Sequence, residues 1–473
     1  MAQITNPSLR NKTIYSVYVR NHSKTGDFEG LIADLERISN LGVDIIWLLP
    51  IYPIGAEKRK GTLGSPYAIS NHRAINPEFG TMDDFSNFIE AAHGRGLAVI
   101  IDIVFNHTSA DSLMRKANPN WFWKNSNGVP GSRIDEWSDV IELDYSIKEL
   151  WNYQIETLKD WIMHGVDGFR CDVAPLIPLP FWFDARDACS QIKPDTIWIA
   201  EAVESSFIHA VRRMGFDCLS DCELLEVFDL SYDYDVYPDW ISLIYGAIDL
   251  KHYVDRLRIQ ESTHRESDLK LRFLENHDQS RASKLFATAS FDRHITSTIS
   301  SQVQGSSHAG YIQSTLAAWT AFSLFQKGTT LIYAGQEYMA SHQPSLFNRD
   351  PIDWLTKSDV NCIKHHSLLI QFIALKKSGI VRDGYFWYPP APAGYIAAAY
   401  ERRDSNTSLI GLRIGVFNVE AQPSCKFNIG THWGELRLDA VFHNPLDNSK
   451  SVLDRGILAI DDQITILDWG LID

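Results

Sequence analysis

The chain has 473 residues, of which 45% are hydrophobic, 22% charged and 12% aromatic. This composition is typical of a globular protein with a large core, and it excludes disordered, collagen-like and coiled-coil chains. The formal charge of −15 comes from 59 acidic and 44 basic residues, and no local basic patch reverses it. We therefore expect neither nucleic acid nor a membrane surface as a partner.

The amino-terminal residues, MAQITNPSLRNKT, are polar where a signal peptide would be apolar. No run approaches the roughly 18 apolar residues of a membrane span, so we expect a cytoplasmic protein. The six cysteines form neither a CxxC zinc motif nor a dense disulfide framework, which predicts buried, reduced thiols at Cys171, Cys189, Cys218, Cys222, Cys362 and Cys425.

Short apolar runs alternate with helical patterns along most of the chain. The runs predict strands at Ile14–Val19, Ile45–Leu49, Leu97–Val104, Gly168–Cys171, Ile197–Ala200, Phe228–Tyr232, Leu271–Leu274 and Thr329–Tyr333. Apolar residues three and four positions apart predict helices at Leu31–Leu41, Met82–Arg95, Ile147–His164 and Ser314–Phe325. This order favours a (β/α)8 TIM barrel of the α/β class. The alternative, an open doubly wound sheet, would usually carry a Gly-rich phosphate loop, and no GxGxxG or GxxxxGK[ST] occurs.

Three stretches depart from this alternation. Residues 107–146 are rich in Asn, Ser, Gly and Trp and predict a small subdomain inserted after the third strand. Beyond residue 377, alternating runs predict a C-terminal antiparallel β domain, at Tyr395–Tyr400, Ser408–Phe417, Glu435–Phe442 and Ile464–Ile466. The expected barrel parts are thus 1–106 and 147–376, followed by 377–473. The polar stretch Arg281–Tyr311 is expected to be a long loop that lines or covers the site.

Polar residues stand at the C-terminal ends of four predicted strands, in the runs IIDIVFNH, GFRCD, IWIAE and LRFLENHD. The active site of a parallel barrel lies at the C-terminal ends of its strands, so these side chains should meet. Paired carboxylates are what cleavage of a glycosidic bond needs, one as nucleophile or base and one as acid. A single Asp after a strand is often only a helix cap, so the ordered combination carries the prediction.

The same segments resemble the α-amylase family of glycoside hydrolases over nearly the full chain. DIVFNH, GFRCDVA, AEAVE and ENHDQSR match its four signature segments in order, and GVDIIWLLPIYP, SPYAISNHRAINPEFGT and GTTLIYAGQE add support. The resemblance implies a barrel, a small domain inserted after strand three and a C-terminal β-sandwich. This agrees with the segmentation reached from the pattern of residues.

The resemblance also implies catalytic roles. Asp172 would be the nucleophile that forms a covalent glycosyl-enzyme, and Glu201 the general acid and then base. Asp278 would stabilise the oxocarbenium-like transition state. A separation of about 5–5.5 Å between the first two carboxyl groups would preserve the α configuration. Arg170, two residues before Asp172, faces the same way along the strand and can hold that carboxylate ionised.

Further matched positions imply contacts with the sugar that is cleaved. His107 and His277 would bond its hydroxyls, Tyr67 would lie under its ring, and Asp102 belongs to the same signature as His107. Imidazole suits hydroxyls because its two nitrogens donate and accept in one plane. The aromatic residues of the insertion, Trp121, Phe122, Trp123 and Trp137, either stack on further glucose units or form that subdomain's core, and the core is slightly favoured.

The chain departs from the family after the nucleophile. Many members have Lys-His there, touching the leaving group, with a backbone carbonyl that binds calcium; this chain has Pro175 and Leu176. Asn106 fits the family's calcium-ligand position and Glu142 lies near another, but a hard cation needs six or more oxygens. We therefore expect no required cofactor, with calcium at Asn106 as the only metal considered.

These observations favour an intracellular retaining hydrolase of α-1,4 bonds in maltooligosaccharides or dextrins. A transglycosylase, a sucrose-acting enzyme and a glucosyl isomerase of the same family share the carboxylates and stay open as alternatives. A glycan-binding scaffold would not need Asp172 and Glu201. The expected partner is an α-glucan oligosaccharide, and the sequence does not give the oligomeric state.

Overall fold

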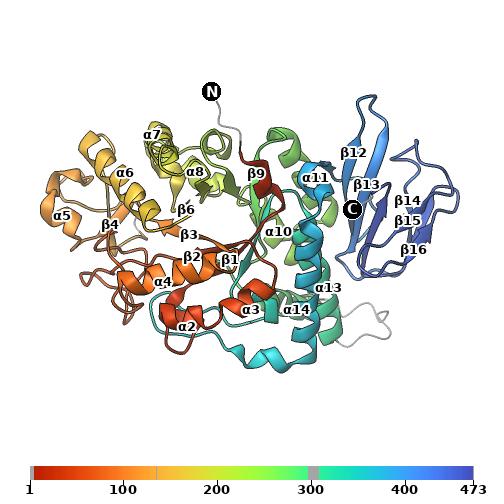
Figure 1. Cartoon of the computed structure of the whole chain (residues 1–473), viewed down its shortest axis with the longest axis horizontal. Helices are drawn as coiled ribbons and strands as arrows, with labels where there is room; N and C mark the ends of the chain where they lie inside the picture. Colours follow the sequence, from red (N-terminus) through yellow and green to blue (C-terminus); the bar gives the residue numbers. More distant parts are fainter. Residues whose placement is uncertain (1–4, 135, 297–307, 472–473) are drawn as a thin grey trace.

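The computed structural model describes residues 5–134, 136–296 and 308–471. Eight parallel strands close a barrel in the order β1, β10, β9, β8, β7, β6, β3, β2. Helices lie around the barrel in Figure 1. The predicted (β/α)8 fold is therefore confirmed. The strands are β1 (Thr13–Val17), β2 (Ile45–Leu48), β3 (Ala98–Ile103), β6 (Gly168–Cys171), β7 (Ile197–Ala200), β8 (Leu230–Tyr232), β9 (Leu269–Arg272) and β10 (Thr329–Tyr333).

Helices surround this barrel, so its strands are buried on both faces. Every residue of β1, β2 and β6 is buried, which explains the continuous apolar run of β2 and the mostly apolar residues of β1. The helices are α1 (Val19–His22), α2 (Phe28–Ile32), α3 (Leu35–Asn40), α4 (Met82–His93), α6 (Lys148–Met163), α7 (Leu179–Ser190), α8 (Ser205–Arg213), α9 (Asp221–Leu224), α10 (Tyr237–Ile244), α11 (Leu250–Thr263), α12 (Ala282–Thr296), α13 (His308–Phe325), α14 (Val360–Lys376) and α15 (Gly379–Asp383). The single helix predicted at Leu31–Leu41 is wrong in extent, because α2 and α3 share that stretch.

The segment between β3 and α6 forms a small unit on the barrel. Its strands β4 (His107–Ser109) and β5 (Val140–Glu142) pair antiparallel, and α5 (Leu113–Ala117) follows β4. Phe122 is buried in a separate apolar cluster here, against which Trp121 packs, so these two aromatic residues serve the core. We keep residues 107–146 as the proposed limits of the insertion.

The C-terminal part contains antiparallel sheets, drawn in blue in Figure 1. A six-stranded sheet has the order β11, β12, β13, β18, β15, β16, and a two-stranded sheet pairs β14 with β17. The ring of Phe417 on β13 lies 5.5 Å from that of Phe322 on α13, which joins this part to the barrel. The strands are β11 (Tyr385–Trp387), β12 (Tyr395–Arg403), β13 (Leu409–Asn418), β14 (Cys425–Asn428), β15 (Val441–His443), β16 (Lys450–Val452), β17 (Ile457–Ile460) and β18 (Ile464–Trp469).

The structure corrects the loop predicted at Arg281–Tyr311. Residues 282–296 form α12, and residues 297–307 of the predicted loop lie outside the described residues. The carboxylate of Glu275 accepts from the Ala282 backbone N–H at 2.7 Å and binds Arg281 at 2.6 Å. A buried carboxylate thus caps the start of α12. The polar composition of this stretch gives no sign of that helix.

The six cysteines are unpaired, as predicted, but not all are buried. Cys222 is exposed and Cys425 is half-buried, which contradicts the expectation of six buried thiols. Among the described residues, no helix combines the length and apolar character needed to cross a bilayer.

Candidate active site

Arg170 lies at the centre of a carboxylate cluster at the C-terminal ends of the barrel strands. Asp102 on β3 and Arg170 on β6 are register partners, so their side chains meet inside the barrel. One Nη atom of Arg170 lies 2.8 Å from Asp102 and 2.9 Å from Asp172, and the other lies 2.8 Å from Glu201. A single guanidinium that is 1% exposed thus binds three carboxylates.

Burial controls the protonation of this cluster. Desolvation raises the pKa of Asp172, Glu201 and Asp102, while the charge of Arg170 acts in the opposite direction on each. The carboxylates also raise one another's pKa, because one guanidinium neutralises only one of three negative charges. The cluster can therefore hold a proton near neutral pH, which a general acid requires.

Val173, directly after Asp172, orients the carboxyl group of Glu201. Its backbone N–H donates to Oε2 of Glu201 at 2.7 Å. Its φ of 36° lies in the left-handed region, which is strained for a β-branched residue. No sequence signal marks this conformation.

Aromatic and imidazole rings cover the other side of the cluster. The hydroxyl of Tyr67 lies 2.6 Å from Nε2 of His277 and donates to Asp102 at 3.2 Å. The two rings are nearly parallel, with an angle of 13°. Nε2 of His277 is also 3.1 Å from Asp278, whose side chain is 42% exposed. Asp278 is therefore the catalytic candidate most open to solvent.

His107 reaches the same cluster from the insertion. Its Nε2 lies 3.9 Å from Oδ2 of Asp172, and its ring is 5.5 Å from that of Trp137. Burial lowers the pKa of His107 to about 4 even though Glu142 and Asp139 raise it. The imidazole is therefore neutral at pH 7 and able to bond a hydroxyl.

Two residues that contact Arg170 were not predicted. Trp47 on β2 and Tyr232 on β8 place their rings 5.3 Å and 5.5 Å from the guanidinium carbon of Arg170. The Tyr232 hydroxyl accepts from Nε of Arg170 at 3.2 Å. In the sequence both appear as ordinary buried strand residues.

A cavity of about 470 Å³ opens beside Glu201. The rings of Trp137 and Phe207 stack there at 6.4 Å with an angle of 27°, and Tyr234 and Gln279 also line the cavity. Trp137 was considered from the sequence as a sugar platform, whereas Phe207 on α8 was missed. This mostly apolar space suits the flat face of a sugar ring.

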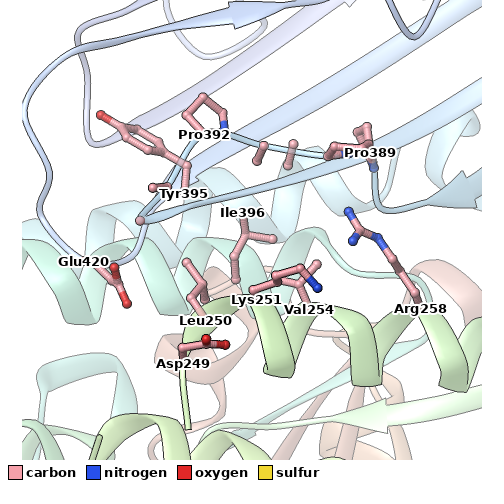
Figure 2. A pocket seen from close by; sticks show the side chains of 15 residues that line it. Asp249, Leu250, Lys251, Val254, Arg258, Pro389, Pro392, Tyr395, Ile396 and Glu420 are labelled. Carbon is pink, nitrogen blue, oxygen red and sulfur yellow. The ribbon is translucent and has the colours of Figure 1, made fainter.

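A second cavity lies away from this cluster. This open pocket of about 410 Å³ lies between α11 and residues 389–397, which lead into β12. Figure 2 shows the side chains that line it. Its walls include Leu250, Val254 and Ile396, with Arg258 and Glu420 at the edge. None of the predicted site residues lines it, so it is not the catalytic cleft.

Glu142, one of the two residues considered for calcium, does not fit a hard cation. Glu142 is fully buried, and its carboxylate accepts from Nε of Arg133, the Arg133 backbone and Ser132. The amide nitrogen of Asn106 lies 3.3 Å from His107. A calcium ion needs six or more oxygens, and the carboxylate considered for it already binds a guanidinium.

A separate acidic cluster is also neutralised by a side chain. Asp221, Asp235 and His264 converge, but Nζ of Lys270 lies 2.6 Å from Asp221 and 3.0 Å from Asp235. The positive charge that a metal would supply is therefore already present.

A closed parallel barrel with buried carboxylates at the C-terminal ends of its strands is the architecture of a TIM-barrel enzyme. The sequence model described as the α-amylase catalytic domain matches residues 15–402. The chain belongs to the α-amylase family of glycoside hydrolases, enzymes that act on α-glucans.

Solved and curated relatives agree with this assignment. An α-amylase from Lactobacillus plantarum is 37% identical with a TM-score of 0.85, covering 98% of this chain and all of that one. A noncanonic maltogenic α-amylase from Thermotoga neapolitana is 29% identical with a TM-score of 0.80, over 98% and 100% of the two chains. α-Amylase 3 from Dictyoglomus thermophilum is 26% identical over 74% of this chain and 68% of its own length.

Proposed function

We propose that the protein is an intracellular, retaining hydrolase that cleaves α-1,4 bonds of maltooligosaccharides or dextrins. The observation that carries this proposal is the contact of one guanidinium with both Asp172 and Glu201. This contact holds a nucleophile candidate and an acid candidate side by side. Retaining cleavage requires such a pair.

The reaction would proceed in two displacements. In the first, Glu201 gives its proton to the glycosidic oxygen while an oxygen of Asp172 attacks C1, so the C1–O bond to the leaving sugar breaks. In the second, Glu201 takes a proton from water, whose oxygen attacks C1 and breaks the ester bond to Asp172. Two inversions at C1 give net retention.

The division of roles follows the matched signature segments, and the neighbours of these carboxyls hold them in one cluster. Arg170 favours the ionised form of Asp172 through a charge-assisted bond at 2.9 Å. Arg170 contacts Glu201 as well, and burial raises the pKa of both carboxyls, so either one can hold a shared proton near neutral pH. Asp278, His277, His107 and Tyr67 are proposed to hold the sugar being cleaved, with Asp102 supporting Arg170 and Tyr67.

Transfer to a sugar hydroxyl is the second candidate, and the cavity beside Glu201 favours it. Its aromatic lining would hold a sugar that competes with water for the covalent intermediate. A maltosyltransferase from Chlorobaculum tepidum, "Alpha-1,4-glucan:maltose-1-phosphate maltosyltransferase", is 32% identical over 43% of this chain and 34% of its own length. Sucrose-acting and isomerising enzymes would use the same intermediate.

Product analysis distinguishes these reactions. We would incubate the protein with maltoheptaose, alone and with excess maltose, and with sucrose, beside an Asp172→Asn control. Shorter oligosaccharides alone support the hydrolase, longer ones support transfer, and rearranged sucrose supports an isomerase. An equal rate for Asp172→Asn would contradict the proposed nucleophile. We propose that none of these reactions needs a metal.

A further inference from the structure

An ion pair within the insertion, between the half-buried Arg133 and the buried Glu142, lies beside the barrel, and we call it the junction pair. The carboxylate of Glu142 is fully buried and accepts from Nε of Arg133, from the Arg133 backbone N–H at 2.6 Å and from Ser132 Oγ at 2.8 Å. Three donors from one short segment thus converge on this carboxylate. Such a set satisfies a buried charge without a metal ion.

The guanidinium of Arg133 also reaches the barrel. Its central carbon lies 4.9 Å from the ring centroid of Phe216, in the loop after α8. Phe216 in turn meets Trp123 of the insertion edge to face, at 6.3 Å and 83°. Arg133 therefore bridges the insertion and the barrel, as a structural cation between two units would do.

The pairing of strands β4 and β5 connects the junction pair to the catalytic cluster. Glu142 on β5 is the register partner of His107 on β4. His107 in turn places Nε2 3.9 Å from Oδ2 of Asp172. A shift of β5 would move β4 with it, and with β4 the imidazole beside the nucleophile candidate.

A second pair, between Asp139 of the insertion and Lys60 in the loop after β2, provides a comparison. Asp139 is 4% exposed, and its carboxylate lies 2.7 Å from Nζ of Lys60. Asp139 precedes β5, so it is outside the ladder that holds His107. Asp139 and Glu142 are thus both buried carboxylates neutralised by a protein cation, but only Glu142 is paired with His107.

We propose that the junction pair takes the place of a calcium ion between insertion and barrel, and that Arg133 and Glu142 are positioning residues for His107. This inference rests on the proposed function only where it concerns catalysis. The fold should be independent of calcium, and loss of the pair should reduce turnover more than its effect on stability explains.

Calcium dependence is tested on the whole protein without any substrate. We would measure the Tm after exhaustive treatment with EDTA and again with excess CaCl2. The proposal expects the same Tm in both. A Tm that falls with EDTA and returns with CaCl2 would overturn it, whatever sugar the enzyme acts on.

Variants test the pair itself. Arg133→Met leaves a buried carboxylate unpaired and should lower the Tm, whereas Arg133→Met with Glu142→Gln removes both charges and should regain part of the loss. Arg133→Lys keeps the charge and should retain most of the Tm. If Arg133→Met does not fold, Glu142→Gln alone supplies the comparison. Equal Tm values for Arg133→Met and the double variant would contradict an ion pair at this place.

Kinetics separate positioning from stability. The double variant should lower kcat for maltoheptaose on the order of ten- to a hundred-fold, because a displacement of about 1 Å has this effect on a catalytic group. The control, Lys60→Met, should lower the Tm but leave kcat unchanged. If kcat falls equally in the double variant and in Lys60→Met, the junction pair is only a structural contact and does not position His107. If no glucan is turned over, the proposed function fails, and displacement of the His107 ring signals in NMR spectra still tests positioning.

Discussion

The backbone N–H of Val173 donates to Glu201 at 2.7 Å while Val173 itself has a φ of 36°. The residue that follows the nucleophile candidate therefore orients the acid candidate, and it does so in a strained conformation. Strain of this kind persists only where the surrounding structure enforces it. The side chain of Val173 packs with Leu176 and Val211, which supplies that enforcement.

The strained conformation of Val173 predicts an unusual order of stability among variants at this position. Glycine adopts the left-handed region freely, whereas a residue with a Cβ loses about 1–2 kcal/mol there. Both Val173→Gly and Val173→Ala remove the packed side chain, so the glycine variant should be the more stable of the two by about 1 kcal/mol. Urea denaturation measures this difference. An alanine variant that is clearly more stable would contradict the strained conformation.

Replacing Arg170 tests the bridge between the carboxylates. Lysine keeps the charge but lacks the planar fork that reaches three carboxylates, so Arg170→Lys should lower kcat/KM on the order of a hundred-fold or more. Arg186 is a matched control, since it pairs with the buried Asp229 at 2.7 Å outside the cluster. Arg186→Lys should reduce stability and leave kcat/KM near the wild-type value. Similar losses of activity in the two variants would count against a special role for Arg170.

Stability should depend on pH through Asp172. Burial raises its pKa from an ordinary value near 4 to about 7, although Arg170 opposes this shift. Between these values the folded state binds more protons than the unfolded state, so the free energy of unfolding falls as pH rises from about 4 to about 7. Asp172→Asn removes this contribution and should therefore be more stable than the wild type at pH 8.

Asp278 supplies the opposite control. Burial alone would raise its pKa, but the contact with His277 outweighs burial and lowers it. A lowered pKa adds stability above the ordinary value, which is lost as the pH falls. Asp278→Asn should therefore be less stable than the wild type at pH 8. Denaturation of both variants at pH 5 and pH 8 checks the signs, and a stabilising Asp278→Asn would contradict them.

Phe207 should influence the fate of the intermediate. Its ring stacks on Trp137 in the cavity beside Glu201, so Phe207→Ala should weaken binding of an acceptor sugar by about 1 kcal/mol or more. The ratio of transfer to hydrolysis with excess maltose should fall several-fold. Ile208 is the control, because it packs in the same apolar cluster without lining the cavity. An unchanged ratio in Phe207→Ala would place the acceptor elsewhere.

The barrel could be predicted because its strands are buried on both faces. The apolar run at β2 is continuous, and polar residues such as Asp172 and Glu201 directly follow β6 and β7. Residues 282–296 were misjudged because their polar residues hide the helix that Glu275 caps. A polar residue directly after an apolar strand can be recognised in a sequence. A capping carboxylate such as Glu275, seven residues before the backbone N–H that it binds, cannot.

Other features depend on contacts between distant segments. Trp47 and Tyr232 face Arg170 only after the barrel closes, and Phe207 meets Trp137 only when α8 lies beside the insertion. Glu142 is another such case. Its position in the sequence suggested a calcium ligand, whereas in the structure its carboxylate binds Arg133.

The central claim is that Asp172 forms a covalent intermediate while Glu201 acts as acid and base. The most direct test is proton NMR of maltoheptaose at early times, recording the anomer that appears before mutarotation. We predict the α-anomer with the wild type and no product with Asp172→Asn. The β-anomer as first product, or full activity of Asp172→Asn, would contradict the account.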